Sequence, residues 1–216
     1  MKIALINENS QASKNGLIFA VLEKCAKKYG DEVINYGMFS ENDEHSLTYV
    51  KAGLLSAILL NSKAVDFMVT GCGTGEGAML ALNSFPNVLC GHIVDASDAY
   101  MFRQINDGNA ISLPFAKGFG WGAELNLEQI FDALLSCEGG GGYPKERVVP
   151  EQANKKILDK VKEITHNDML TILKKIDQKF LKETIDYPFF KEQFFKDCKD
   201  ERIAKCLKTV LQKGKK

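Results

Sequence analysis

The sequence predicts an α/β fold: a doubly wound, five-stranded parallel sheet with helices on both faces, followed by a C-terminal helical extension. Three observations predict it. Over the first 150 residues, short apolar segments alternate with segments whose apolar residues have helical spacing. A glycine-rich turn joins the third apolar segment to a helix. After residue 150, only helical patterns follow. The length of 216 residues suits one such domain with an appendage.

Strands are expected where short runs are almost wholly apolar, because the strands of a parallel sheet are covered on both faces. Such runs occupy residues 2–7, 33–36, 66–70, 88–94 and 110–113. Ligands of these Rossmann-like sheets bind outside the carboxyl ends of the strands. Asn7, Cys72 and Asp95 are therefore expected to lie at the ligand-binding edge.

The intervening helices are expected where apolar residues recur at helical spacing. These segments are residues 16–29, 46–62, 78–83, 98–104 and 127–135. Ser46 is the expected N-cap of the second helix, because its hydroxyl can accept a hydrogen bond from the first turn.

A break in composition divides the chain. Four consecutive glycines at residues 139–142 are followed by Tyr143 and Pro144, and beyond Pro150 the pattern is helical and rich in Lys and Glu at residues 155–161, 169–180 and 201–211. An aromatic cluster at residues 187–195 is expected to dock these helices on the rest of the chain. We therefore expect an α/β domain at residues 1–150 and a helical extension at residues 151–216.

The charges of these two parts are opposite. Residues 151–216 hold 17 Lys/Arg and 11 Asp/Glu, a net +6, so the other 150 residues hold 28 − 17 = 11 and 28 − 11 = 17, a net −6. The whole chain has a formal net charge of zero. This balance favours docking of the two parts on each other, with neither nucleic acid nor a membrane surface as partner.

Six cysteines are present without a Cys-x-x-Cys pair and without a histidine at metal-ligand spacing, so we expect no metal site and free thiols. The first residues already read as a strand, and no apolar run is long enough to cross a membrane. These features predict a reduced, cytoplasmic location.

The glycine-rich turn carries the chemistry. Glycines at positions 71, 73, 75 and 77 alternate with Cys72, Thr74 and Glu76. Backbone N–H groups of such a turn, with the positive end of the following helix, suit an anion or a charge that develops during reaction. A buried structural cysteine in a tight turn is the plainer interpretation, but a thiol and a carboxyl group on one turn favour a functional site.

Two other interpretations fit parts of this turn. Residues 73–78 match G-x-G-x-x-A and Asp95 ends the next strand, as in a dinucleotide site, although the motif opens the third β-α unit instead of the first. Gly71-Cys72-Gly73 also resembles the core of a nucleophile elbow, whose histidine would be His45, His92 or His166. A Walker P-loop is excluded because no Gly-Lys-Ser/Thr follows.

Three segments, CGTGEGAMLALNSFPNVLCG, RQINDGNAISL and EGGGGYPKERV, occur in the order found in a known family. With them, residues 1–150 resemble the sugar-phosphate isomerases of the ribose-5-phosphate isomerase type B and galactose-6-phosphate isomerase family. The resemblance implies an aldose–ketose isomerase of a pentose or hexose phosphate, which moves a proton between C1 and C2 through a cis-enediolate. It implies no cofactor, and a homodimer or higher oligomer with sites at the subunit interface.

The resemblance also implies the roles of individual residues. One group of family members uses a cysteine at the Cys72 position as the base and another uses a glutamate at the Glu76 position; this chain has both. Substrate-binding residues are expected to be Glu8, Asn9, Gly73, Thr74, Gly75, Gly77, Asn106, Tyr143 and Arg147.

Four positions depart from the family pattern. The ring-opening histidine is Ile105 here, the N-terminal Asp-His pair is Glu8-Asn9, and the first arginine of the tail is Tyr143. The substrate could therefore be an open-chain or differently substituted sugar. A non-catalytic sugar-phosphate or dinucleotide-binding α/β module remains the alternative.

Overall fold

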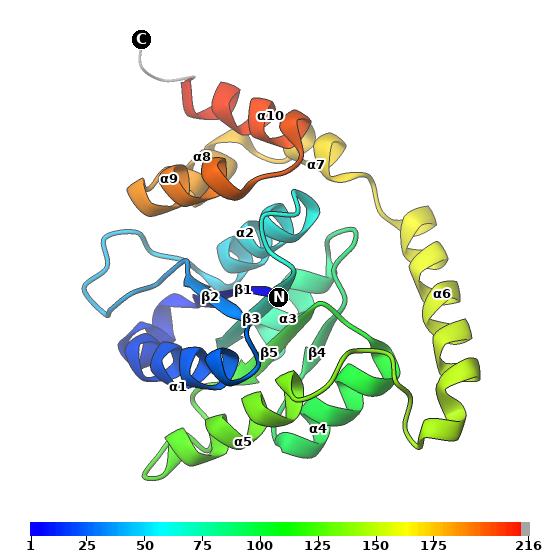
Figure 1. Cartoon of the computed structure of the whole chain (residues 1–216). Coiled ribbons are helices and arrows are strands. Elements are labelled where there is room, and N and C mark those ends of the chain that lie inside the picture. The colour runs from blue at the N-terminus through cyan, green and yellow to red at the C-terminus, as the bar shows by residue number, and fades with distance from the viewer. Residues whose placement is uncertain (213–216) are drawn as a thin grey trace.

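The computed structural model describes residues 1–212 and has the predicted α/β architecture (Figure 1). The strands are β1 (Lys2–Asn7), β2 (Glu32–Asn35), β3 (Phe67–Cys72), β4 (Cys90–His92) and β5 (Ala110–Pro114). The helices are α1 (Asn15–Lys28), α2 (Tyr49–Asn61), α3 (Glu76–Asn83), α4 (Ala96–Met101), α5 (Ala123–Leu135), α6 (Val148–Thr165), α7 (Met169–Lys175), α8 (Gln178–Ile185), α9 (Pro188–Asp197) and α10 (Glu201–Gln212). Three short helical turns are η1 (Asn9–Lys14), η2 (Phe102–Asn106) and η3 (Lys145–Arg147).

The strands form one parallel sheet in the order β2-β1-β3-β5-β4. Side chains alternate between its faces, as the two-residue period of a strand requires. Ile3 and Leu5 of β1 pack with α1, α4 and α5, whereas Ala4 and Ile6 pack on the opposite face with α2 and α3. The doubly wound sheet predicted from the sequence is therefore confirmed.

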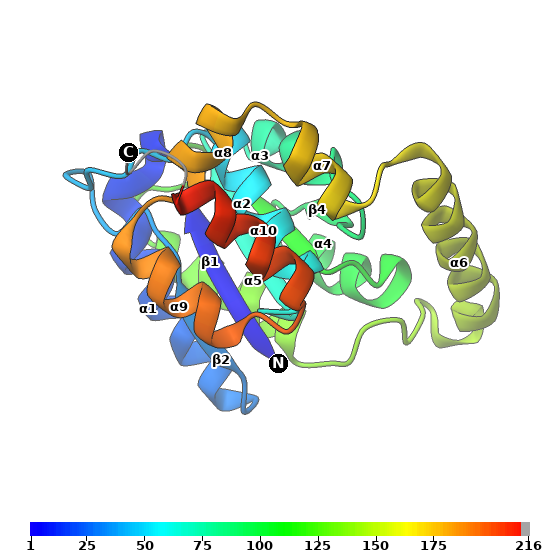
Figure 2. The same cartoon turned by 90° about the horizontal axis from the view of Figure 1, so that it is seen from above.

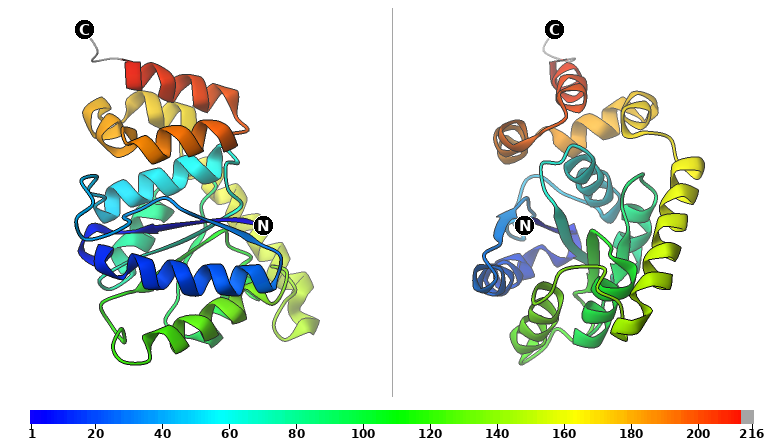
Figure 3. Two further views of the ribbon diagram at one scale, coloured as in Figure 1. Left: turned by 60° about the vertical axis from the view of Figure 1, so that its left-hand side comes forward. Right: turned by 45° about the vertical axis from the view of Figure 1, so that its right-hand side comes forward.

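Helices α7 to α10 form a further layer outside α2 (Figures 2 and 3). This layer explains why α2 is apolar on all sides, since residues 52–60 are all buried between the sheet and the outer helices. The predicted aromatic cluster supplies the contact: Tyr187, Phe190 and Phe194 are buried in the same hydrophobic cluster as α2.

Helix α6 connects this outer layer to the α/β part along the side of the sheet (Figure 1). It begins at Val148, so the expected division at residue 150 falls in its first turn. Five apolar side chains of α6 are exposed. By helical spacing Val149, Ile157, Val161 and Ile164 share one side of the helix, and the fifth is Leu158. Within residues 1–212, no helix combines the length and the apolar composition that a membrane crossing requires.

Three local predictions were wrong. The N-cap of α2 is Thr48, whose side chain accepts a hydrogen bond from the Lys51 N–H, and Ser46 lies outside the helix. The expected helix at residues 169–180 is two helices, because Ile176 is extended and Asp177 caps α8. Strand β4 has only three residues, which suits its place at the edge of the sheet.

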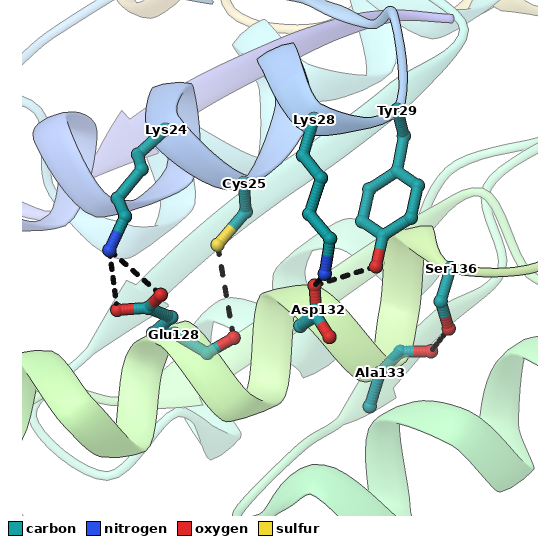
Figure 4. A network of polar contacts seen from close by, with 8 residues as sticks. All are labelled: Lys24, Cys25, Lys28, Tyr29, Glu128, Asp132, Ala133 and Ser136. Carbon is teal, nitrogen blue, oxygen red and sulfur yellow. Dashed lines mark hydrogen bonds and ion pairs between the residues drawn. The ribbon is translucent and has the colours of Figure 1, made fainter.

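Polar contacts join α1 to α5 on the lower face of the sheet (Figure 4). Lys24 pairs with Glu128, and the Asp132 carboxylate accepts hydrogen bonds from Lys28 and Tyr29. These side chains are largely exposed, so each ion pair adds little stability. Burial raises the pKa of the neighbouring Cys25 thiol, which leaves it a packing residue.

Candidate active site

The turn between β3 and α3 can be built only with glycine at two positions. A side chain at Gly71 would collide with the Phe115 ring and the Leu113 carbonyl oxygen. Gly75, the N-cap of α3, has φ +80°, and a Cβ there would lie 2.8 Å from the His92 ring. The glycines therefore let the backbone of the turn pack directly against β4 and β5, where a residue with a Cβ would collide with its neighbours.

Hydrogen bonds from β4, β5 and the segment that follows β5 fix the turn. The carbonyl oxygen of Cys72 accepts from the Phe115 N–H at 2.9 Å, and that of Gly73 from the Ala116 N–H at 3.0 Å. The Gly75 carbonyl oxygen accepts from Ser112 Oγ at 2.6 Å, and that of Thr74 from His92 Nε2 at 2.9 Å. With four consecutive carbonyl groups held from one side, the turn is rigid before any ligand binds.

Cys72 and Glu76 occupy different environments on this turn. Cys72 ends β3 and is 8 % exposed, while Glu76 is exposed in the first turn of α3. The Cys72 Sγ lies 3.7 Å from the place that a Cβ on Gly77 would take, and the Tyr49 ring lies 3.4 Å from it. The turn therefore carries a shielded thiol beside Gly77 and, at Glu76, a solvated carboxyl group.

The segment after β1 lies beside this turn, because β1 is the neighbour of β3 in the sheet. The Glu8 N–H donates to the Gly71 carbonyl oxygen at 3.2 Å, and its carboxylate accepts from Ser10 Oγ at 2.6 Å. Glu8 is 8 % exposed. Glu8 therefore meets the glycine turn, whereas the neighbouring Asn9 side chain donates to Ser46 Oγ at 3.1 Å in the loop before α2.

Three residues at this edge were missed by the sequence analysis. Gln11 lies against Gly73, with its Nε2 3.8 Å from the place of a Cβ there, and its Oε1 accepts from Lys14 Nζ at 2.8 Å. Burial lowers the pKa of Lys14. Tyr49, the third, starts α2 at a distance in sequence from the turn. No local sequence pattern predicts such residues, because only the packing of β1 and α2 around β3 brings them to the carboxyl edge of the sheet.

A cavity of about 230 Å³ opens next to the turn on the β4–β5 side. It is lined by His92, Val94, Leu113, Pro114, Phe115, Lys117, Gly118, Phe119, Ala123, Asn126, Leu127 and Ile130. Lys117 gives it a positive charge. His92 and Phe115, which donate hydrogen bonds to the turn, also line this cavity, so the cavity adjoins the turn. Among residues 1–212, no group of His, Cys, Asp or Glu side chains is arranged to hold a metal ion.

Asn106, Tyr143 and Arg147 lie at the opposite edge of the sheet. Asn106 ends η2, just before the amino end of β5, and the neighbouring Arg103 contacts Met1 at the start of β1. The glycine segment 139–142 follows η2 closely, through the hydrogen bond from the Gly140 N–H to the Arg103 carbonyl oxygen. Within one chain, therefore, these three residues do not reach Cys72.

Tyr143 and Arg147, two of these three residues, already contact neighbouring side chains. The Tyr143 ring stands edge-on to Tyr100 at 5.9 Å, and its N–H donates to the buried Glu151 carboxylate. Arg147 is 64 % exposed in its side chain and lies 3.6 Å from Glu151. Arg147 thus presents a guanidinium to solvent with one carboxylate beside it.

Asp95 does not form a dinucleotide site with the turn. Its carboxylate caps α4 by accepting from the Asp98 N–H at 2.9 Å and from Ser97 Oγ at 2.6 Å. Moreover, β5 lies between β3 and β4, so the strand that Asp95 follows is not the neighbour of the strand that carries the turn. Both observations disfavour the G-x-G-x-x-A interpretation.

Known proteins resemble this chain over its whole described length. Residues 3–149 match the family described as Ribose/Galactose Isomerase, and residues 164–210 match a family described as Ribose-5-phosphate isomerase. A crystal structure of a 4-deoxy-L-threo-5-hexosulose-uronate ketol-isomerase complexed with a tartrate is 61 % identical, with a TM-score of 0.96 over 98 % of this chain and 99 % of that one.

Two ribose-5-phosphate isomerases extend the comparison. The enzyme from Vibrio parahaemolyticus is 49 % identical, with a TM-score of 0.94 over 98 % of this chain and 99 % of that one. The type B enzyme from Trypanosoma cruzi, at 18 % identity and a TM-score of 0.62, covers 75 % of this chain and 98 % of its own, which shows a shared fold.

Proposed function

The chain belongs to the ribose/galactose isomerase family, and from this premise we propose that it interconverts the aldose and ketose forms of an open-chain acidic sugar. The observation that carries the proposal is the rigid glycine turn with Cys72 and Glu76 on it. A base at this turn would take the proton from C2 of the aldose and return it to C1, while the hydroxyl proton of O2 passes to O1, which leaves the ketose. The turn and the start of α3 would stabilise the enediolate oxygen, an effect of roughly 3–4 kcal/mol per donor in other enzymes.

The substrate class follows from the departures from the family pattern. Ile105 replaces the residue that opens a sugar ring, so a substrate that is already open suits this chain. A 5-keto, 4-deoxy hexuronate, the substrate type named for the 61 % identical ketol-isomerase, lacks the C4 and C5 hydroxyl groups with which an aldohexose closes its ring. Such a compound needs no ring-opening acid.

The anionic group of the substrate gives a second argument. Tyr143 replaces one of the two family arginines, which leaves Arg147 and, at the cavity, Lys117. One guanidinium pairs well with a planar carboxylate through two parallel hydrogen bonds, whereas a phosphate dianion carries more charge than one arginine neutralises. A carboxylate sugar therefore fits these residues better than a sugar phosphate.

A sugar phosphate is the second candidate. It is favoured by the match of residues 3–149 to the ribose/galactose isomerase family and by the 49 % identity to the Vibrio parahaemolyticus ribose-5-phosphate isomerase. Arg147 and Lys117 would then share the phosphate.

We further propose that the active unit contains two copies of the chain. Asn106 and Arg147 lie at the amino edge of the sheet and Cys72 at the carboxyl edge, so one copy cannot bring them to one substrate. In a homodimer with two-fold symmetry, each carboxyl edge would face the amino edge of the other copy. The exposed apolar side of α6, which begins directly after Arg147, is the surface we expect to meet the second copy.

An isomerase assay tests the proposal. We expect the intact protein to convert 4-deoxy-L-threo-5-hexosulose uronate with a kcat/KM at least about 10-fold above that for ribose 5-phosphate or galactose 6-phosphate. In deuterated water the ketose product should gain deuterium at C1. Preference for a phosphate would select the second candidate. Absence of turnover with all three compounds would contradict the isomerase proposal.

A further inference from the structure

The loop at residues 37–48, which joins β2 to α2, lies between the candidate site and the C-terminal helices. On its inner side it holds the segment that follows β1. The Gly37 carbonyl oxygen accepts from the Asn7 N–H at 2.7 Å, and the Leu47 carbonyl oxygen accepts from the Asn9 N–H at 2.7 Å. Both ends of the loop are thus bonded to the site segment, and Ser46 adds the bond to the Asn9 side chain.

On its outer side the same loop is held by α8 and α9. The His45 ring stacks on the Tyr187 ring with 4.0 Å between centroids and 21° between planes. His45 Nε2 donates to the Thr184 carbonyl oxygen at 3.0 Å, and the Phe39 ring packs edge-on against Phe189 at 5.3 Å. Burial lowers the pKa of His45, which favours the neutral ring that this stacking and hydrogen bond use.

Tyr187 also ties the outer helices to the strand that enters the loop. Its hydroxyl donates to the Tyr36 carbonyl oxygen at 2.7 Å, and this bond is buried. Tyr187 is 5 % exposed and Tyr36 is fully buried. One side chain therefore fixes the beginning of the loop through Tyr36 and its far part through His45.

The end of the loop delivers a side chain to the catalytic turn. Thr48 caps α2, and the next residue, Tyr49, has its ring against Gly77 beside the Cys72 thiol. The outer helices reach this point as well, since Lys51 lies 3.4 Å from Glu183 of α8. The loop thus contributes to the site twice, through Asn9 and through Tyr49.

We propose that His45 and Tyr187 are positioning residues: they hold the 37–48 loop against the carboxyl edge of the sheet and thereby set Asn9 at that edge and Tyr49 beside Cys72. The helical extension then acts on substrate binding, in addition to covering α2. The inference rests on the proposed function, because its readout is the turnover of the site at Cys72 and Glu76. The rival explanation is a purely structural cover, for which any loss of packing in the extension would have equal effects.

Three variants and a matched control separate these explanations. His45→Ala removes the stacking partner, Tyr187→Leu removes the ring, and Tyr187→Phe removes only the hydroxyl. Phe194→Leu is the control, because Phe194 is equally buried in α9 but its ring contacts are Phe190 and Phe195. Each variant is measured for kcat, KM, melting temperature and amide hydrogen exchange of the loop.

We expect His45→Ala and Tyr187→Leu to raise KM by about 10-fold and to speed exchange in the loop, since small displacements of substrate-positioning groups are costly. Tyr187→Phe should show the same changes to a smaller degree and remain folded. Phe194→Leu should lower the melting temperature as Tyr187→Leu does, with KM and loop exchange near those of the intact protein.

A double variant distinguishes positioning of Asn9 from a purely structural role, because only positioning makes the two effects on KM depend on each other. If His45 acts through Asn9, His45→Ala should raise KM much less in an Asn9→Ala background than in the intact protein. Equal effects in both backgrounds, or equal KM changes in Phe194→Leu and Tyr187→Leu, would overturn the inference. If the intact chain turns over no sugar, the proposed function fails. Unchanged loop exchange in the His45 and Tyr187 variants would separately refute the positioning role.

Discussion

Cys72 and Glu76 lie four residues apart in the chain but differ in their access to water. The thiol is shielded beneath Gly77 and Tyr49, whereas the carboxyl group is solvated at the start of α3. A general base must reach the proton that it takes, and of the two groups the Glu76 carboxyl group is the accessible one. We therefore propose Glu76 as the proton-transfer base, with Cys72 in a supporting role.

This assignment predicts unequal losses in two variants. Glu76→Gln should lower kcat by about 100-fold or more, the usual effect of removing a general base, and Cys72→Ser should lower it less. The measurement is steady-state turnover with the best substrate. Glu124→Gln is the matched control, because Glu124 is an exposed acid in the first turn of α5. Near-intact turnover in Glu76→Gln would transfer the role to Cys72.

At the scale of elements, the site depends on how closely β3, its turn and α3 approach β4 and β5. Four carbonyl groups of the turn are held by neighbouring segments, and Gly75 makes the approach possible. The helix that follows is short, so the turn and not α3 alone sets the direction of its first N–H groups. Rigidity of the backbone is the feature that a substrate would meet.

The close approach predicts that Gly75→Ala is damaging on two counts. A Cβ would lie 2.8 Å from the His92 ring and 2.9 Å from a backbone atom of Leu113, and the positive φ is strained for alanine. We expect a loss of more than about 2 kcal/mol in the free energy of unfolding together with a loss of turnover.

Chemical denaturation and activity assays measure both effects. Gly16→Ala is the control, because a Cβ there meets no atom within 4 Å and the position is helical, where alanine is favourable. Unchanged stability and activity in Gly75→Ala would show that the turn can accommodate the added methyl group.

At the scale of the whole molecule, the sheet separates the expected site residues into two sets. Cys72 and Glu76 follow the carboxyl end of β3, whereas Asn106 precedes the amino end of β5, and Arg147 follows η2 through the glycine segment. The exposed apolar side of α6 lies next to the second set. A second copy of the chain is the simplest way to unite the sets.

This arrangement predicts complementation between inactive variants. Glu76→Gln and Arg147→Ala are expected to be poorly active alone. After unfolding and refolding together in equal amounts, about a quarter of the intact activity should return, because half of the dimers are mixed and each mixed dimer has one intact site. Mixing without refolding is the control. No recovery, in a preparation shown to contain mixed dimers, would mean that both residues serve the same site within one copy.

The sequence by itself determined the order and type of most elements. The apolar runs at residues 2–7 and 110–113 are local features of the chain, as is the glycine turn. The apolar runs predict strands correctly because a strand that is covered on both faces must be apolar along its whole length. It also determined the family, through three segments that retain their order and spacing. It did not determine the cap of α2 or the break between α7 and α8, since several nearby polar residues could serve as caps and the surrounding packing selects one of them.

Only the tertiary structure decided which of the expected site residues can meet. Asn106 and Arg147 carry suitable side chains, but the direction of η2 places them at the amino edge of the sheet. Conversely, Tyr49 and Gln11 lie against the turn, and Lys14 bonds to Gln11, although nothing in their local sequence marks them. The reason is physical: a helical or strand period is read from neighbours in the chain, whereas a site is assembled by strand order and crossover connections between residues far apart in it.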